Sequence, residues 1–193
     1  MKKHAVLEIA LLFALVGCFS SSPDKKYFQI NLEAPPAAAP FSGSLLVDRF
    51  EISSLYDDFR IIYRVSAFEI NYYAYQFWAE KPSKLLRDSL IRYLEASRLF
   101  PKIYVEPTKD AAVDWVFRGT VHQIEEVDAP GAWSARLNMK IEVADTRTGA
   151  VLASRRFDRQ EPLSRKDVSE MPAVLSRILG EELRALFAEL KGK

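Results

Sequence analysis

The chain of 193 residues contains little cysteine, histidine and glycine, with one Cys, two His and seven Gly. A disulfide within the chain needs two cysteines, so Cys18 alone excludes one. The two histidines, His4 and His122, cannot form a histidine cluster, and no Gly-x-Ser-x-Gly elbow accompanies them. We therefore expect no transition-metal site and no Ser-His-Asp triad. The glycines never gather into a phosphate-binding loop, which argues against ATP binding and leaves no expected cofactor.

An excess of charge of one sign is also missing. The chain has 27 Lys and Arg against 26 Asp and Glu, for a formal net charge of +1. Nucleic acid and anionic membranes attract proteins with a strong positive balance, so neither is expected as the main ligand. Three pairs of adjacent acids are the only candidates for paired catalytic carboxylates. Neighbouring side chains point apart on strands and helices, so we expect solvated surfaces at Asp57-Asp58, Glu125-Glu126 and Glu181-Glu182. The predicted class is therefore a protein that is not an enzyme.

No hydrophobic run is long enough for a transmembrane helix. The apolar stretch 5–16 follows a short positive start and is interrupted only by Glu8, whereas a helix needs about 20 residues to cross the membrane. It ends at Leu15-Val16-Gly17-Cys18, which resembles the lipobox of bacterial lipoproteins. Residues 1–18 are therefore interpreted as a lipoprotein signal peptide with Cys18 as the lipidated residue. The alternative is an ordinary cleaved signal with an accidental cysteine, which the charge of Glu8 favours.

The lipobox resemblance implies a mature protein that begins at Cys18 and carries acyl chains, palmitate among them, on its sulfur and amine. Several chains together anchor a protein stably, where a single chain binds a membrane only marginally. In lipoproteins of this type, Asp directly after the cysteine indicates retention at the inner membrane. Phe19 stands at that position, which favours the periplasmic face of the outer membrane. Residues 19–26 form a polar tether too short to take the domain far from its membrane.

Residues 27–193 are expected to form one domain. Extended segments are predicted over 27–32, 45–52 and 102–106, and a hairpin over 60–65 and 68–73 with Ser66 and Ala67 at its turn. Alternating apolar residues indicate three further strands, over 115–121, 137–143 and 151–157, the last two joined by a tight turn at Asp145–Gly149. Periodic apolar residues predict helices from Pro82 to near Phe100 and from about Val168 onward.

These elements predict an α+β fold: a two-layer sandwich whose mixed, mainly antiparallel sheet of about six or seven strands carries both helices on one face. Each helix has a single apolar stripe, so both can be buried against the same face. The other face of the sheet then needs water, a ligand or another protein. On a strand of this sheet, His122 falls on the polar face and is interpreted as a surface residue.

Aromatic residues are abundant, with 12 Phe, 8 Tyr and 3 Trp. They are densest just after the predicted hairpin turn, where tyrosine and tryptophan combine apolar area with a polar group, as contact surfaces often do. Packing between helix and sheet is the alternative, and it is favoured for Trp78. Strand alternation places Tyr73 and Tyr75 on one side and Tyr72 on the other. Arg64 either pairs with Glu69 or Glu80 or binds a partner. The candidate residues for binding a partner or a lipid are Arg64, Tyr72, Tyr73, Tyr75 and Trp78.

The same segment resembles the PqiC-type auxiliary lipoproteins of ABC transport systems. The motifs are Ile61-Ile62-Tyr63-Arg64, the tyrosines that follow, and Trp78-Ala79-Glu80-Lys81-Pro82 at the start of the helix. The insertion of Lys81 and the lack of leucine after Pro82 depart from the family pattern.

The resemblance implies an auxiliary component of an MCE-type transporter that moves lipids across the cell envelope. Its implied partners are an MCE-domain protein and the ABC transporter complex, the membrane through the lipid anchor, and a lipid; a homo-oligomer is compatible with it. The alternative function is a structural lipoprotein that regulates envelope or cell-wall assembly.

Overall fold

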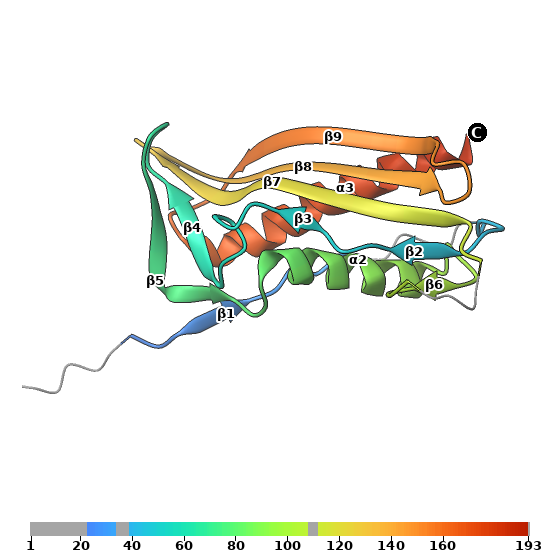
Figure 1. The fold of residues 1–193 in the computed structure, drawn as a ribbon. Coiled ribbons are helices and arrows are strands. Elements are labelled where there is room, and N and C mark those ends of the chain that lie inside the picture. The colour runs from blue at the N-terminus through green and yellow to red at the C-terminus, as the bar shows by residue number, and fades with distance from the viewer. Residues whose placement is uncertain (1–22, 34–38, 108–111, 193) are drawn as a thin grey trace, which may run out of the picture.

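The structure, a computed structural model, describes residues 23–33, 39–107 and 112–192. Cys18 and the lipobox lie outside this part of the chain. The strands are β1 (Lys26–Phe28), β2 (Leu45–Val47), β3 (Glu51–Ile52), β4 (Arg60–Arg64), β5 (Ile70–Trp78), β6 (Ile103–Tyr104), β7 (Trp115–Ala129), β8 (Ala132–Asp145) and β9 (Val151–Pro162). The helices are α2 (Pro82–Ser97), the 3-10 turn η1 (Val168–Glu170) and α3 (Met171–Lys191). Figure 1 shows them as one curved sheet above two helices.

Strand β7 organises the sheet. One of its edges pairs along its whole length with β8 in an antiparallel ladder, and β8 pairs in the same way with β9. Its other edge is shared by three short parallel strands, with β2 at one end, β3 in the middle and β4 at the other end. Beyond β4 come β5 and then β1. The long antiparallel meander is therefore the platform, and the short strands close its open edge.

Local sequence explains where the helices begin and end. Pro82 stands at the first position of α2, where a missing N–H costs nothing, and the helix stops where Arg98 turns left-handed with φ 51°. The side chain of Asp167 accepts a hydrogen bond from the backbone N–H of Ser169, which caps the turn that leads into α3. Glycine is required at Gly149, whose φ of 73° lies in the turn between β8 and β9.

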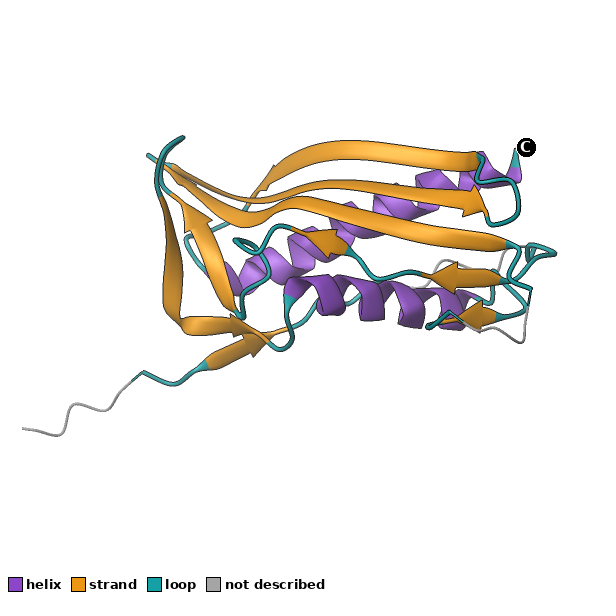
Figure 2. Ribbon diagram, viewed as in Figure 1, coloured by secondary structure: helices purple, strands orange, loops and turns teal. Residues whose placement is uncertain are grey.

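Both helices cover one face of the sheet (Figure 2). The ring of Phe117 on β7 lies 6.4 Å from that of Phe187 on α3, and the buried leucines of α2 belong to the same core. Phe50, in the loop between β2 and β3, packs on the same face with its ring 6.0 Å from Phe117. Phe50 packs so closely on β7 that a Cβ at Gly119 would approach its ring to 2.9 Å. The inward residues of the long strands complete a continuous apolar core with the helices, among them Val121, Leu137, Met139 and Ile141. The opposite face of the meander is polar, with Arg118, Lys140 and Asp158 on it.

The structure confirms the α+β class, the mixed sheet, the hairpin and both helices. It differs in detail. The predicted strand over 45–52 is two strands, and the sheet has nine strands because short segments pair along the edge of β7. The hairpin turn is wider than Ser66 and Ala67, since β4 ends at Arg64 and β5 begins at Ile70. The long strands also extend beyond the predicted alternating segments, to Ala129 in β7 and Pro162 in β9.

Candidate functional site

The β4–β5 hairpin carries most of the residues that the sequence singles out for binding. Its antiparallel register pairs Tyr63 with Asn71 and Arg64 with Ile70. The tip closes where the N–H of Val65 donates to the carbonyl of Glu69 at 3.1 Å. Phe68 stands on this tip with its side chain fully exposed, at 100%. The hairpin therefore presents an apolar tip to its surroundings, and β4 is its strand that pairs with the platform.

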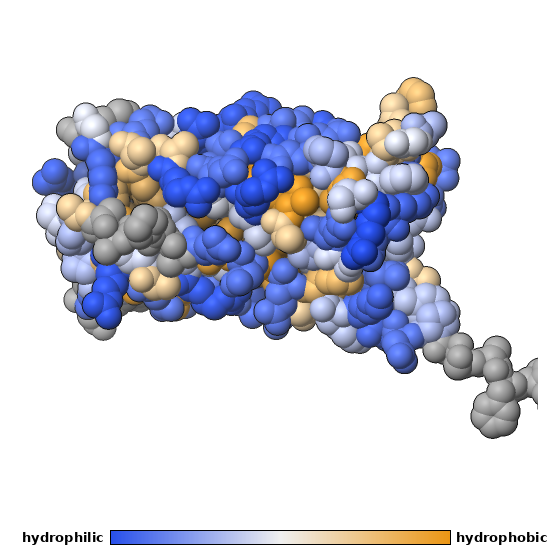
Figure 3. Space-filling model, turned by 180° about the vertical axis from the view of Figure 1, so that it is seen from behind, coloured by the Kyte–Doolittle hydropathy of each residue, from blue (hydrophilic) through white to orange (hydrophobic). Residues whose placement is uncertain are grey.

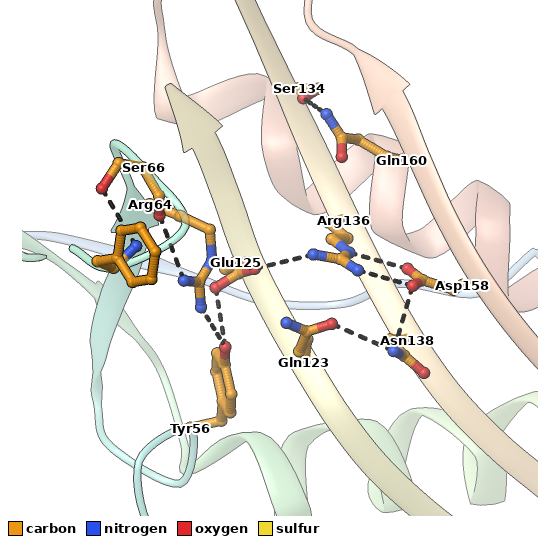
Figure 4. A network of polar contacts seen from close by, with 11 residues as sticks. Tyr56, Arg64, Ser66, Gln123, Glu125, Ser134, Arg136, Asn138, Asp158 and Gln160 are labelled. Carbon is orange, nitrogen blue, oxygen red and sulfur yellow. Dashed lines mark hydrogen bonds and ion pairs between the residues drawn. The ribbon is translucent and has the colours of Figure 1, made fainter. Parts of the chain in front are cut away.

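A buried polar cluster fixes the hairpin to the outer face of the platform (Figure 4). Its centre is Glu125 on β7, which is 0% exposed. Arg64 donates from Nε to Glu125 Oε1 at 2.9 Å, and the hydroxyl of Tyr56 donates to Oε2 at 2.9 Å. Arg64 also donates from Nη2 to the Tyr56 hydroxyl at 3.0 Å. One carboxylate of β7 thus holds both β4 and the loop before it, which lie more than 60 residues away in the chain. We call Tyr56, Arg64 and Glu125 the hairpin clamp.

The clamp continues across the sheet into a surface network. Nη1 of Arg136 on β8 lies 3.7 Å from Glu125 Oε1. Arg136 also forms a bidentate ion pair with Asp158 on β9, from Nε to Oδ1 at 2.8 Å and from Nη2 to Oδ2 at 2.7 Å. The hydrogen bonds from Arg136 lower the pKa of Asp158. Asn138 donates to Gln123 at 3.1 Å and to Asp158 at 3.3 Å. Bidentate arginine pairs fix geometry as well as charge. A rigid polar surface therefore extends from the hairpin across the platform.

The next residue of β7 makes a different site on the helix side. Glu126 is 1% exposed, and both of its oxygens accept from the hydroxyl of Tyr73, at 3.1 Å each. Burial raises the pKa of Glu126, because the charged form loses its hydration. Burial, together with the charge of Glu126, also raises the pKa of Tyr73. The Tyr73 ring packs against Tyr63 at 4.8 Å, so this pair anchors the hairpin from inside.

The structure separates the five candidate residues of the hairpin. Trp78 is 1% exposed and belongs to the core, as the packing alternative predicted. Tyr72 is half-buried beneath the guanidinium of Arg60, which lies 4.1 Å from its ring centre. Tyr73 faces Glu126, so Tyr72 and Tyr73 do have different surroundings. Tyr75 is the one tyrosine of the three that is exposed. A role in binding stays a prediction for each of them.

Two expectations about charge are wrong. Arg64 pairs with Glu125, not with Glu69 or Glu80. Glu125 and Glu126 are buried rather than solvated, and Glu182 is buried beside Arg155, with 2.8 Å between Arg155 Nε and Glu182 Oε2. Strand alternation correctly separates Glu125 and Glu126 onto opposite faces. Alternation alone does not show that the hairpin packs over Glu125 or that Glu126 is buried on the helix side. The only indication of these buried charges in the sequence was a pair of adjacent acids within one long strand.

Other classes of site find no support in the described ranges. No group of three or more His, Cys, Asp and Glu side chains there is arranged to hold a metal ion. His122 is exposed on β7, as predicted. None of the helices described is long and apolar enough to span a membrane.

Two solved structures share the fold of this chain at low sequence identity. A crystal structure of protein XCC0632 from Xanthomonas campestris, of the DUF330 family, has a TM-score of 0.72 at 21% sequence identity and covers 86% of this chain and 96% of its own. A crystal structure of an uncharacterized protein has a TM-score of 0.69 at 16% identity and covers 87% of this chain and 99% of its own. No curated protein matches the sequence significantly.

A family model decides the assignment. The model of the ABC-type transport auxiliary lipoprotein component matches residues 28–186, which run from β1 into the last turns of α3. This range includes the hairpin, the clamp and the polar network. The family is a component of transport systems rather than a family of enzymes. The chain therefore belongs to the ABC-type transport auxiliary lipoprotein component family.

Proposed function

We propose that the protein is exported, lipidated at Cys18, and serves as a non-enzymatic auxiliary component of an MCE-type ABC transporter that moves lipids across the cell envelope. The observation that carries this proposal is the family match over residues 28–186. The lipobox before the domain supplies the anchor, and Phe19 in place of Asp favours the periplasmic face of the outer membrane. ATP hydrolysis belongs to the transporter, because this chain has no phosphate-binding loop.

The surface that meets the transporter is proposed to be the polar outer face of the platform together with the clamped base of the β4–β5 hairpin. The clamp holds the hairpin at a fixed angle, which reduces the ordering cost of binding. Arg136, Asn138 and Lys140 lie in one row on β8, where a protein partner can read charge and hydrogen bonds. Tyr72 lies on β5 beside this face and supplies apolar area.

The anchor is tested with Cys18→Ser in cells that express the full chain, with Ser22→Ala as a matched change in the same segment. Palmitate labelling should disappear in Cys18→Ser and remain in Ser22→Ala, because Cys18 is the only cysteine in the sequence and the proposed site of acylation. Normal labelling of Cys18→Ser would overturn the lipoprotein assignment.

The partner is tested by affinity purification of the native lipoprotein from membranes. The expected co-purifying proteins are an MCE-domain protein and its permease. Lys140→Glu should weaken this association, whereas Arg147→Glu, in the turn after β8, should leave it unchanged. Recovery of a cell-wall synthase in place of the transporter would overturn the transport assignment and favour a role in envelope assembly.

A further inference from the structure

Exposed apolar side chains gather at one end of the molecule. Among the described residues, the large hydrophobic side chains left exposed are few, and most belong to β1, to the loop before β4 and to the β4–β5 hairpin. We call this group the aromatic end, and it consists of Tyr27, Leu55, Phe59, Phe68 and Tyr75. The others are Val105, after β6, and Val151, at the start of β9. Figure 3, turned by 180° from Figure 1, shows an apolar projection at the end of the molecule where Figure 1 places β5.

Pairing of the strands joins the aromatic end into one surface. β1 lies in parallel register beside the last residues of β5, and Tyr27 pairs with Phe77 with ring centres 5.6 Å apart. Lys25 places its ammonium 5.7 Å from the Phe77 ring. From there β5 runs for nine residues toward the hairpin tip, a span of up to about 30 Å. Tyr27 and Phe68 therefore mark the two extremes of the aromatic end (Figure 1).

The chain itself limits how far this end can be from a membrane. Seven residues separate Cys18 from Lys26 at the start of β1. An extended chain covers at most about 3.5 Å per residue, so the eight steps from Cys18 to Lys26 span at most roughly 28 Å. This argument rests on the lipidation of Cys18 in the proposed function. The tether permits the domain to stand off the bilayer and equally permits it to lie on the surface, so the side chains at the aromatic end decide between the two.

We propose that the aromatic end is a membrane-contact surface, with Tyr27 and Phe68 resting at the headgroup level of the bilayer that holds the lipid anchor. Tyr27, 63% exposed, joins an apolar ring to a polar hydroxyl, a combination that favours the membrane interface. Lys25 and Lys26 flank it with flexible cations that can reach lipid phosphates. Phe68 has a fully exposed ring, an apolar area that a lipid surface can cover.

Two contacts at the ends of β5 fix an orientation that an anchor at Cys18 alone does not fix. The platform then points away from the bilayer, with the β8–β9 turn and Val151 at the far end (Figure 1). The polar outer face stands beside the membrane and remains open to a partner protein. The membrane contact thus explains why the apolar residues and the polar network occupy different parts of the molecule.

The test uses the full lipidated protein in phosphatidylcholine vesicles, with and without brominated acyl chains, which quench tryptophan on contact. Tyr27→Trp and Phe68→Trp place a reporter at each extreme of the aromatic end. Val151→Trp is the matched control, since Val151 is 50% exposed at the opposite end. Each variant is compared with the parent protein, so that the emission of the three native tryptophans can be subtracted.

We expect the added emission of Tyr27→Trp and Phe68→Trp to be quenched in brominated vesicles and that of Val151→Trp to persist. Equal quenching of all three, or none, in protein that floats with the vesicles would overturn the membrane contact while leaving the anchor intact. Failure of the protein to float would instead overturn the lipidation on which the argument rests. Emission that responds to the purified transporter proteins but not to brominated lipid would assign the aromatic end to a protein interface.

Discussion

Glu125 and Glu126 are neighbours on β7 and both are buried, yet different groups hold them. Glu125 faces the outer side and receives hydrogen bonds from Arg64 and Tyr56, with Arg136 3.7 Å away. Glu126 faces the helix side and accepts hydrogen bonds from the neutral hydroxyl of Tyr73. Burial penalises both charges, but Glu125 forms an ion pair with Arg64, whereas the charge of Lys166 favours ionised Glu126 without a direct ion pair. For these two acids, the partner group rather than the depth of burial therefore decides how the buried charge affects stability.

The two acids therefore affect stability in opposite ways. The pKa of Glu126 is raised by burial, so the folded state holds its proton more tightly than the unfolded state does. Its contribution to stability is present below the ordinary glutamate pKa and is lost as the pH rises through the raised folded value. Near neutral pH, Glu126 costs stability, whereas Glu125 joins the hairpin to the platform through an ion pair.

The largest expected effect comes from breaking the clamp at its cation. Arg64→Met leaves the carboxylate of Glu125 buried without its nearest positive charge, at a cost of about 3 kcal/mol in the free energy of unfolding. The distant Arg136 prevents a larger loss. Urea unfolding measures the change. Arg118→Met is the control, since its pair with Glu142 is half exposed at 3.6 Å and should change stability by less than about 1 kcal/mol. Equal losses of unfolding free energy in the two variants would show that the clamp stabilises the fold no more than a half-exposed ion pair does.

Changing each acid to its amide sharpens the comparison. Glu125→Gln removes the charge that Arg64 needs and should destabilise the fold by about 2 kcal/mol. Glu126→Gln removes a poorly solvated charge and should raise stability at neutral pH.

Unfolding measured from acid to neutral pH should also show that Glu126→Gln loses the decline in stability that the wild type has above the ordinary glutamate pKa. The same sign for both substitutions at neutral pH would contradict the proposed difference between the two carboxylates.

The smallest effect concerns the hydroxyl groups of two adjacent tyrosines. Tyr73→Phe removes the donor to Glu126 and should cost about 1 kcal/mol, since a buried acceptor loses its partner. Because that hydrogen bond lowers the pKa of Glu126, the decline in stability should also extend to higher pH. Tyr72→Phe loses only a long contact of 3.4 Å to the carbonyl of Leu55, and the same thermal and pH scans should show almost no change. Matching losses would mean that the hydroxyl of Tyr73 is not what Glu126 depends on.

Much of the fold could be predicted because its signals are local. Pro82 and the apolar period after it mark α2, and the alternation from Leu137 to Val143 marks the inward face of β8. The short strands β3 and β6 could not be predicted with their partners. Each has two residues, and pairing with a distant edge, rather than propensity, makes such a segment a strand.

The candidate site was predicted in part. The hairpin and its tyrosines were found from aromatic density, while the clamp was missed. Glu125 lies 61 residues from Arg64 and 69 from Tyr56 along the chain. Alternation indicated only that Glu125 and Glu126 point apart, and solvent was expected around both. The packing of β4 beside the end of β7 covers Glu125 instead.

The sequence by itself determined the features that depend on neighbouring residues: the apolar stretch before Cys18, the order of strands and helices, and the inward face of each long strand. Only the tertiary structure decided which polar residues are buried and what holds them. The parallel pairing of Tyr63 with Glu126 brings the hairpin onto the platform, and it buries Glu125 beneath the arginine of one strand and the tyrosine of a loop. Periodicity reports which way a side chain points, whereas burial depends on what distant chain segment arrives to cover it.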